Sequence, residues 1–242
     1  MQPDWKDRTH LLLKDKLLLL EKAHILVVGL GGVGAYAAEM LCRAGVGKLT
    51  LIDADTVDAT NRNRQLPALI STEGRLKTEV MRERLLDINP EIKLQILSEF
   101  IKDERIAEVL DSDKYDYAVD AIDSLSPKAF LIAEALKREI PLVSAMGAGG
   151  KTDPSKVQVA DISKTYQCPL ASYMRKRLRK MGIAKGFQAV FSTEEQMQNI
   201  GREDAVSEFK RTTVGTISYM PAIFGCWCAS VCVGDLVRGK ND

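Results

Sequence analysis

A short apolar run that leads directly into a glycine-rich loop is the feature that most limits what this chain can fold into. Ile25-Leu26-Val27-Val28 is followed at once by Gly29-Leu30-Gly31-Gly32-Val33-Gly34. Such a loop turns a strand tightly into a helix, whose N-terminal N–H groups can then approach a phosphate closely. The pattern predicts a strand–loop–helix unit that binds a nucleotide, although NAD and ATP sites look alike at this level.

Strand-like and helix-like segments alternate along the first 150 residues and beyond. We expect strands at 24–28, 48–53, 92–97, 115–121, 141–145 and 157–161, and helices at 11–21, 35–44, 71–86, 105–110, 128–138 and 171–180. This alternation predicts an α/β fold, a Rossmann-like doubly wound sheet that is mostly parallel, with helices on both faces. The polar segment 192–211 is expected to be a loop.

Composition narrows the function classes. The net charge of +1 excludes a global attraction to nucleic acid, so any such contact needs a local basic patch. The five cysteines include no C-x-x-C pair, which is typical of reduced thiols in a cytoplasmic protein and gives no reason to expect zinc. The apolar stretch 220–233 is shorter than the roughly 20 residues of a spanning helix. We expect it to be a buried helix, with membrane-surface association as the alternative.

Charged residues after the second expected strand distinguish between the two nucleotides. Asp53 ends that strand at a distance suited to a ribose hydroxyl, as in dehydrogenases. Arg62, Arg64 and Lys77 follow, and a solvated face is the ordinary interpretation of such cations. Hydride transfer has no need of these cations, whereas cleavage of a triphosphate needs fixed positive groups around the phosphates. The segment therefore favours ATP.

A pair of acids, Asp120 and Asp123, ends the fourth expected strand. Mg²⁺ commonly takes one or two carboxylates together with phosphate oxygens, so Asp123 is a candidate metal ligand. Ser124 or Ser126, just before Pro127, fits the alternative role of a helix N-cap. The two roles are compatible.

Taken in order, these motifs resemble the E1-like superfamily, whose members adenylate carboxylates with ATP and Mg²⁺. The resemblance implies an E1-like C-terminal elaboration, a homodimer, and catalytic roles for Arg64, Lys77, Asp123 and an N-terminal arginine from the partner subunit, here Arg8. It also implies that Asp123 holds the metal and leaves room for a monovalent cation. The residues that it assigns to the nucleotide are Gly29, Gly31, Gly32, Gly34, Asp53, Asp55, Asn61, Arg64, Gln65, Lys77, Asp123 and Ser124.

The second half of the chain resembles one branch, the tRNA threonylcarbamoyladenosine dehydratases. The resemblance rests chiefly on Gly147-Ala148-Gly149-Gly150, Asp153-Pro154, Asp161-Ile162-Ser163-Lys164-Thr165 and Pro169-Leu170-Ala171. It implies ATP-dependent cyclisation of N6-threonylcarbamoyladenosine at tRNA position 37 through an acyl-adenylate. Gly147 to Gly150 would then let the backbone approach the acyl group. Cysteine-desulfurase or sulfur-acceptor proteins are further partners that it suggests.

A basic run fits a tRNA substrate. Five of six consecutive residues are cationic, and the expected tRNA-binding set is Arg175, Lys176, Arg177, Arg179 and Lys180. We expect one adenylation domain over 1–242, divided into an N-terminal helix (1–22), a nucleotide-binding core (23–150), and a substrate-binding or crossover region with the apolar helix (151–242).

Other functions remain open at this stage. One is an adenylyltransferase that activates the C-terminal glycine of a ubiquitin-like sulfur carrier; such enzymes often carry paired zinc cysteines, which this chain lacks. More distant alternatives are an NAD-dependent oxidoreductase and a non-catalytic E1-like scaffold. Segment 210–216 contains no thiol and Cys168 is the only loop cysteine, so we favour a mechanism without a thioester.

Overall fold

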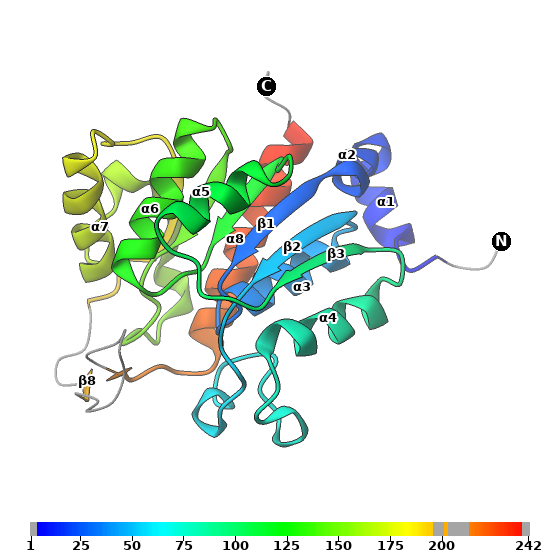
Figure 1. Ribbon diagram of the computed structural model, residues 1–242, viewed down its shortest axis with the longest axis horizontal. Coiled ribbons are helices and arrows are strands. Elements are labelled where there is room, and N and C mark those ends of the chain that lie inside the picture. Colours follow the sequence, from blue (N-terminus) through cyan, green and yellow to red (C-terminus); the bar gives the residue numbers. More distant parts are fainter. Residues whose placement is uncertain (1–3, 196–200, 203–212, 239–242) are drawn as a thin grey trace.

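A computed structural model describes residues 4–195, 201–202 and 213–238, and within them the chain builds a seven-stranded sheet (Figure 1). The strand order is β3-β2-β1-β4-β5-β7-β6, parallel throughout except that β6 runs antiparallel to β7. The strands are β1 His24–Val28, β2 Lys48–Ile52, β3 Lys93–Leu97, β4 Tyr117–Asp120, β5 Leu142–Ala145, β6 Val157–Asp161 and β7 Gln188–Ser192. A small separate ladder pairs β8 Gly201–Arg202 with β9 Thr213–Val214.

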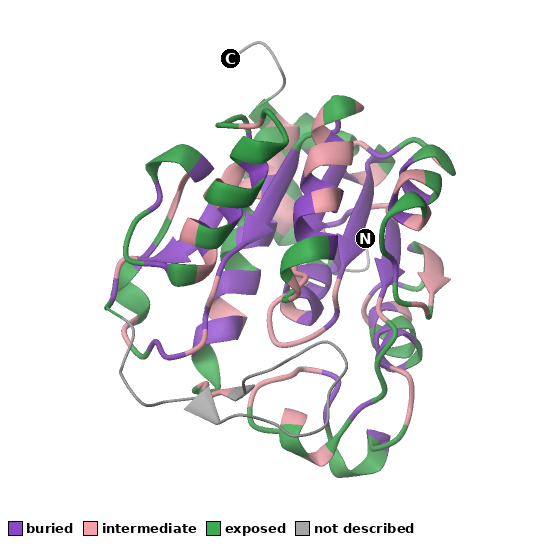
Figure 2. Ribbon diagram, turned by 60° about the vertical axis from the view of Figure 1, so that its left-hand side comes forward, coloured by how far each residue is buried: buried purple, intermediate pink, exposed green. Residues whose placement is uncertain are grey.

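Helices cover both faces of the sheet, as the sequence predicted (Figures 1 and 2). One face carries α2 Leu17–Lys22, α3 Gly34–Arg43, α4 Lys77–Ile88 and α8 Tyr219–Arg238. The other carries α5 Glu104–Asp111, α6 Leu125–Lys137 and α7 Pro169–Lys180. Successive side chains of β1 explain the two cores, because Ile25 and Val27 join the first and Leu26 and Val28 join the second. A strand buried on both faces is what a parallel sheet in an α/β fold requires.

The order of the strands reverses between β1 and β4. The chain moves outward from β1 to β2 and β3, and then returns to place β4 on the other side of β1. In open α/β sheets the crevice at such a switch point, beside the carboxyl ends of the strands, is the usual ligand site. The loops after β1, β2 and β4 are therefore the expected ligand-binding region of this fold.

Several element boundaries differ from the predictions. The helix expected over 11–21 is divided into α1 Asp7–Leu13, a 3₁₀ turn Lys14–Lys16 and α2. The helix expected from residue 71 begins only at Lys77, because Gly74 adopts a φ of +82° that helical geometry forbids. Strand β7 was not predicted at all. Most of the loop expected over 192–211 lies outside the described residues, but within the described part Ser192 belongs to β7 and Gly201–Arg202 form β8.

The terminal apolar helix is longer than predicted. α8 has 20 residues and, by length and composition alone, is apolar enough to cross a membrane. It nevertheless packs along α3, and Phe224, Cys228 and Cys232 are fully buried in the first core. Cys226, by contrast, is exposed. One face of the terminal helix is therefore buried, as expected, and the opposite face is exposed.

Candidate active site

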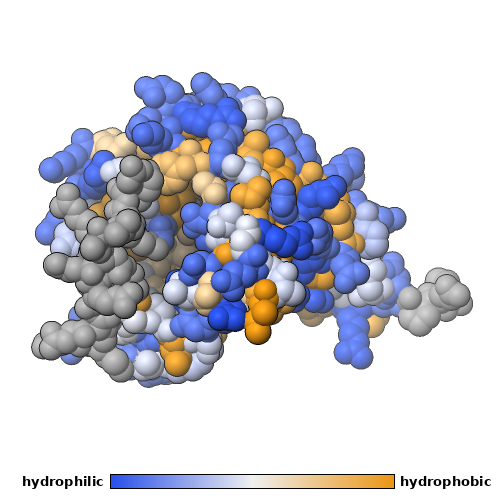
Figure 3. Space-filling model, turned by 60° about the horizontal axis from the view of Figure 1, so that its bottom comes forward, coloured by the Kyte–Doolittle hydropathy of each residue, from blue (hydrophilic) through white to orange (hydrophobic). Residues whose placement is uncertain are grey.

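A cavity of about 480 Å³ lies at the switch point, where the carboxyl ends of β1, β2 and β4 meet. Figure 3 looks onto this end of the molecule, where a hollow opens between light-orange residues above it and mostly hydrophilic, blue residues to its right. Most of the predicted nucleotide-binding residues line the cavity: Gly29, Gly31, Asp53, Asp55, Asn61, Arg64, Gln65, Lys77, Asp123 and Ser124. Residues separated by almost 100 positions in the sequence thus line one cavity.

Three of the four loop glycines have different physical roles. Gly29 has a φ of +89°, and a Cβ there would lie 2.7 Å from the carbonyl oxygen of Ala121. A Cβ on Gly34 would lie 1.8 Å from the oxygen of Gly29, so this glycine keeps the turn closed. A Cβ on Gly32 would lie 2.8 Å from Cβ of Pro221, so glycine at this position leaves room for the first turn of α8. Neither Gly32 nor Gly34 is among the described residues that line the cavity.

Replacing Gly29 by alanine should cost clearly more stability than replacing Gly74. Both glycines have left-handed φ values, so both variants lose about 1–2 kcal/mol through backbone strain. A Cβ on Gly74 would have no heavy atom within 4 Å, whereas Gly29→Ala must also displace the Ala121 carbonyl, which should add about 1–3 kcal/mol. Urea unfolding measures both variants. Equal losses would show that the close approach to Ala121 is unimportant.

Asp53 supports the glycine loop. Its carboxylate accepts hydrogen bonds from the backbone N–H of Leu30 at 2.5 Å and of Asp55 at 2.8 Å. The pKa of Asp53 is raised above its usual value because burial disfavours the charged form, an effect that Lys77 opposes. The acid that was assigned to ribose therefore also fixes the loop after β1 against the loop after β2.

Two cations extend into the cavity. Lys77, the first residue of α4, is only 4% exposed, and its Nζ lies 2.7 Å from Oδ2 of Asp55, whose side chain is 72% exposed. The Arg64 guanidinium donates to the carbonyl of Thr60 at 3.0 Å and to Oδ1 of Asn63 at 2.8 Å. Burial lowers the pKa of Arg64, and Asp123 opposes that shift. Arg62 does not take part, because it is exposed and bonds the carbonyl of Ala59.

The cavity fits ATP by its chemistry. Lys77 and Arg64 supply the fixed cations that a triphosphate needs, and the loop around Gly29 supplies close backbone approach. Within the described residues, Oε1 of Gln65 is buried with no hydrogen-bond partner, and a donor on a bound nucleotide could satisfy it. Asp123 adds a carboxylate to the cavity lining, the ligand type that Mg²⁺ prefers.

The expected N-cap residue occupies the N-cap position of α6 but does not cap the helix. Ser124 precedes α6, but its hydroxyl makes no capping bond and instead donates to Oδ1 of Asp123 at 3.3 Å. The serine therefore helps to orient the candidate metal ligand.

The first acid of the pair has a different environment. Asp120 and Lys128 are both fully buried, with 2.8 Å between Oδ2 and Nζ. Ser144 also donates to Asp120 at 2.6 Å, and Lys128 donates to the carbonyl of Ile122 at 3.0 Å. The pair thus fixes the loop that carries Asp123. A lysine one turn into a helix gave no signal of burial in the sequence.

Arg8 and the basic run lie away from the cavity. Arg8 is exposed on α1 and does not line the site of its own chain. On α7 the exposed cations are Lys176, Arg177, Arg179 and Lys180. Arg175 is partly buried and bonds Oγ1 of Thr165. The helix therefore presents four of the five predicted cations to solvent.

Comparison with known proteins adds independent information. The model of the ThiF family matches residues 8–238. The tRNA threonylcarbamoyladenosine dehydratase of Bacillus subtilis is 41% identical over 232 residues, covering 93% of this chain and 91% of that protein. Its namesake from Haemophilus influenzae is 42% identical over 238 residues, covering 94% and 90%. The crystal structure of Escherichia coli tRNA N6-threonylcarbamoyladenosine dehydratase with ATP matches with a TM-score of 0.88 at 40% identity, covering 97% of this chain and 95% of that one.

Proposed function

Because the chain belongs to the ThiF family, we propose that it uses ATP to dehydrate N6-threonylcarbamoyladenosine at position 37 of tRNA, which closes the threonylcarbamoyl group into a ring. The observation that carries this proposal is likeness to the dehydratases over nearly the whole chain, at 41% identity over 232 residues. The cavity supports it, because its cations suit a nucleotide that is cleaved at phosphate.

The chain's own residues then act as follows. The threonyl carboxylate attacks the α-phosphate of ATP, and Arg64 and Lys77 stabilise the charge that develops as pyrophosphate leaves. Asp123 would hold Mg²⁺, which supplies further charge neutralisation when it is bound. A nucleophilic group of the same threonylcarbamoyl side chain then attacks the acyl carbon of the acyl-adenylate, which closes the ring and releases AMP. Such an intramolecular step depends mainly on orientation, because effective molarities of well-placed groups are very high.

The thiol of Cys168 has no part in this scheme. It is 4% exposed at the start of α7 and lies beside Gly147. We expect Cys168→Ala to keep the AMP formation rate within about threefold of the native rate, since small repacking effects are all that it should cause. A loss of AMP formation that Cys168→Ser fails to restore, with unchanged thermal unfolding, would instead require a covalent intermediate.

The exposed cations of α7 are the proposed tRNA contact. We expect the double variant Lys176→Ala/Lys180→Ala to bind modified tRNA more weakly and to lower the slope of log affinity against log salt by about 1 to 2. The matched control is Lys14→Ala/Lys16→Ala, which removes the same charge from exposed positions beside α1. Filter binding across a salt series measures both, and identical slopes for the two double variants would contradict the assignment.

Further elements of the proposal concern organisation. We propose one adenylation domain over 1–242 and a cytoplasmic homodimer in which Arg8 reaches the cavity of the partner subunit. Arg8 lies on an exposed helix away from its own cavity, which is compatible with a role across an interface. A monovalent cation and cysteine-desulfurase or sulfur-acceptor partners stay predictions from the resemblance.

ATP–pyrophosphate exchange separates this function from the adenylyltransferase for a sulfur carrier. Three acceptors are compared: tRNA with threonylcarbamoyladenosine, tRNA that lacks the modification, and a carrier protein with a C-terminal glycine. We expect exchange with the modified tRNA only. Robust exchange with the carrier and none with modified tRNA would favour the alternative, and no exchange with any acceptor would favour a scaffold.

A further inference from the structure

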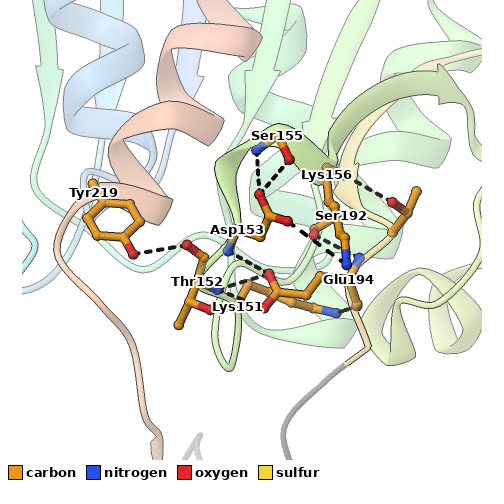
Figure 4. A network of polar contacts seen from close by, with 9 residues as sticks. Lys151, Thr152, Asp153, Ser155, Lys156, Ser192, Glu194 and Tyr219 are labelled. Atoms are coloured by element: carbon orange, nitrogen blue, oxygen red, sulfur yellow. Dashed lines mark hydrogen bonds and ion pairs between the residues drawn. The ribbon is translucent and has the colours of Figure 1, made fainter.

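Residues 214–219, which we call the strap, connect two loops at the active end of the molecule. The backbone N–H of Gly150 donates to the carbonyl of Gly215 at 2.8 Å. The hydroxyl of Tyr219 donates to the carbonyl of Thr152 at 2.9 Å (Figure 4). On the opposite side, Nδ2 of Asn63 donates to the carbonyl of Thr216 at 3.0 Å. The strap is thus hydrogen-bonded to the loop after β5 and to the loop that carries Arg64.

The loop after β5 is itself firmly held. The Glu194 carboxylate accepts from the backbone N–H groups of Thr152 and Asp153, both at 2.9 Å (Figure 4). The buried ammonium of Lys151 donates to the carbonyl of Glu194. A Cβ on Gly149 would lie 2.9 Å from Cγ1 of Val214. Gly149, which belongs to the run expected beside the acyl group, therefore leaves room for Val214 of the strap.

Asn63 joins the strap to the cavity. Its Oδ1 accepts from the Arg64 guanidinium at 2.8 Å while its Nδ2 donates to Thr216. The partners dictate this orientation of the amide, because a guanidinium only donates and a carbonyl only accepts. Asn63 does not line the cavity, whereas Arg64 does. One side-chain amide therefore connects a phosphate-facing cation with a segment that contacts the loop after β5.

We propose that Asn63 is a positioning residue that couples ATP binding at Arg64 to the order of the strap. The inference rests on the proposed use of ATP, but not on the tRNA reaction. Since coupling between two sites is reciprocal, ATP that fixes the Arg64 guanidinium should stabilise the strap, and an ordered strap should aim Arg64. An ordered strap and a correctly aimed Arg64 then occur together.

Amide hydrogen exchange, with ATP as the only added ligand, tests this coupling. In the native chain we expect ATP to slow exchange at Gly150 and along 214–219 by about tenfold, a typical magnitude for coupling between sites. Asn63→Asp keeps an acceptor for Arg64 but cannot donate to Thr216. It should lose the effect of ATP on the strap and, because the coupling is reciprocal, bind ATP up to about tenfold more weakly than native by calorimetry. Arg75→Ala, which changes net charge by the same amount, should keep that effect.

A second variant perturbs the strap at its contact with the loop after β5. Gly149→Ala should displace Val214 and also abolish the effect of ATP on strap exchange, with a loss of ATP affinity no greater than the same tenfold. If ATP leaves strap exchange unchanged in the native chain, or if Asn63→Asp responds to ATP like native, the coupling is refuted. These results stand whether or not modified tRNA is converted, so failure of the proposed reaction is a separate and recognisable outcome.

Discussion

Replacing Lys77 by alanine should lower the rate of AMP formation with modified tRNA by about 10²–10³-fold, the usual cost of removing one preorganised transition-state donor. The ammonium is 4% exposed at the start of α4 and lies on the cavity wall with Arg64. Its ion-pair partner is the exposed Asp55 carboxylate, and it also favours the charged form of the buried Asp53. Single-turnover measurement of AMP is the readout, with urea unfolding to check that the fold is intact.

Arg75→Ala is the matched control for this prediction. Arg75 lies just before α4, pairs with the exposed carboxylate of Glu83 and does not line the cavity. Its loss should leave AMP formation near the native rate. Near-normal turnover by Lys77→Ala, or equal losses in the two variants, would mean that the phosphate site is assigned to the wrong residues.

Replacing Lys128 by methionine should have the largest effect on stability, a loss of about 3–5 kcal/mol in the free energy of unfolding. The variant leaves the fully buried Asp120 carboxylate without its cation, 2.8 Å from where the ammonium was. The side chains have similar volume, so the loss reflects charge and hydrogen bonding rather than a cavity. Urea unfolding gives the number.

Two comparisons sharpen this prediction. Asp120→Asn combined with Lys128→Met removes both charges and should recover much of the lost stability, because breaking a buried pair costs more than replacing it. Arg105→Ala removes a cation from an exposed pair with Glu99 and should have a far smaller effect. A Lys128→Met variant as stable as the native chain would show that the pair does not hold the β4–α6 loop in place.

Local sequence patterns predicted the α/β fold well because apolar runs and glycine turns report directly on buried strands. β1 was predicted with its bounds, and the loop from Gly29 was placed at its end. β7 lies between β5 and β6 in the sheet, and its short apolar run 189–191 was not recognised as a strand. The start of α4 was misjudged because the charged, helix-like stretch after Ser71 hides the left-handed Gly74.

The site shows a similar division. Ten of the predicted nucleotide-binding residues line one cavity, because motif residues cluster at the ends of parallel strands. Gly32 and Gly34 were predicted from the same motif, but their neighbours are Pro221 and Gly29, which only the folded chain reveals. Asn63 and Lys128 gave no local signal, since their importance lies in partners such as Thr216 and Asp120.

The most direct test of the account is the chemical fate of the modified nucleoside. The native chain, ATP and Mg²⁺ are incubated with tRNA that carries threonylcarbamoyladenosine. The tRNA is then digested to nucleosides, and their masses are measured by mass spectrometry. We predict a nucleoside lighter than the substrate by one water, formed together with one AMP, absent without ATP, and formed about 10²–10³-fold more slowly with Lys77→Ala. An unchanged nucleoside mass in the presence of ATP, with the substrate confirmed as modified, would contradict it.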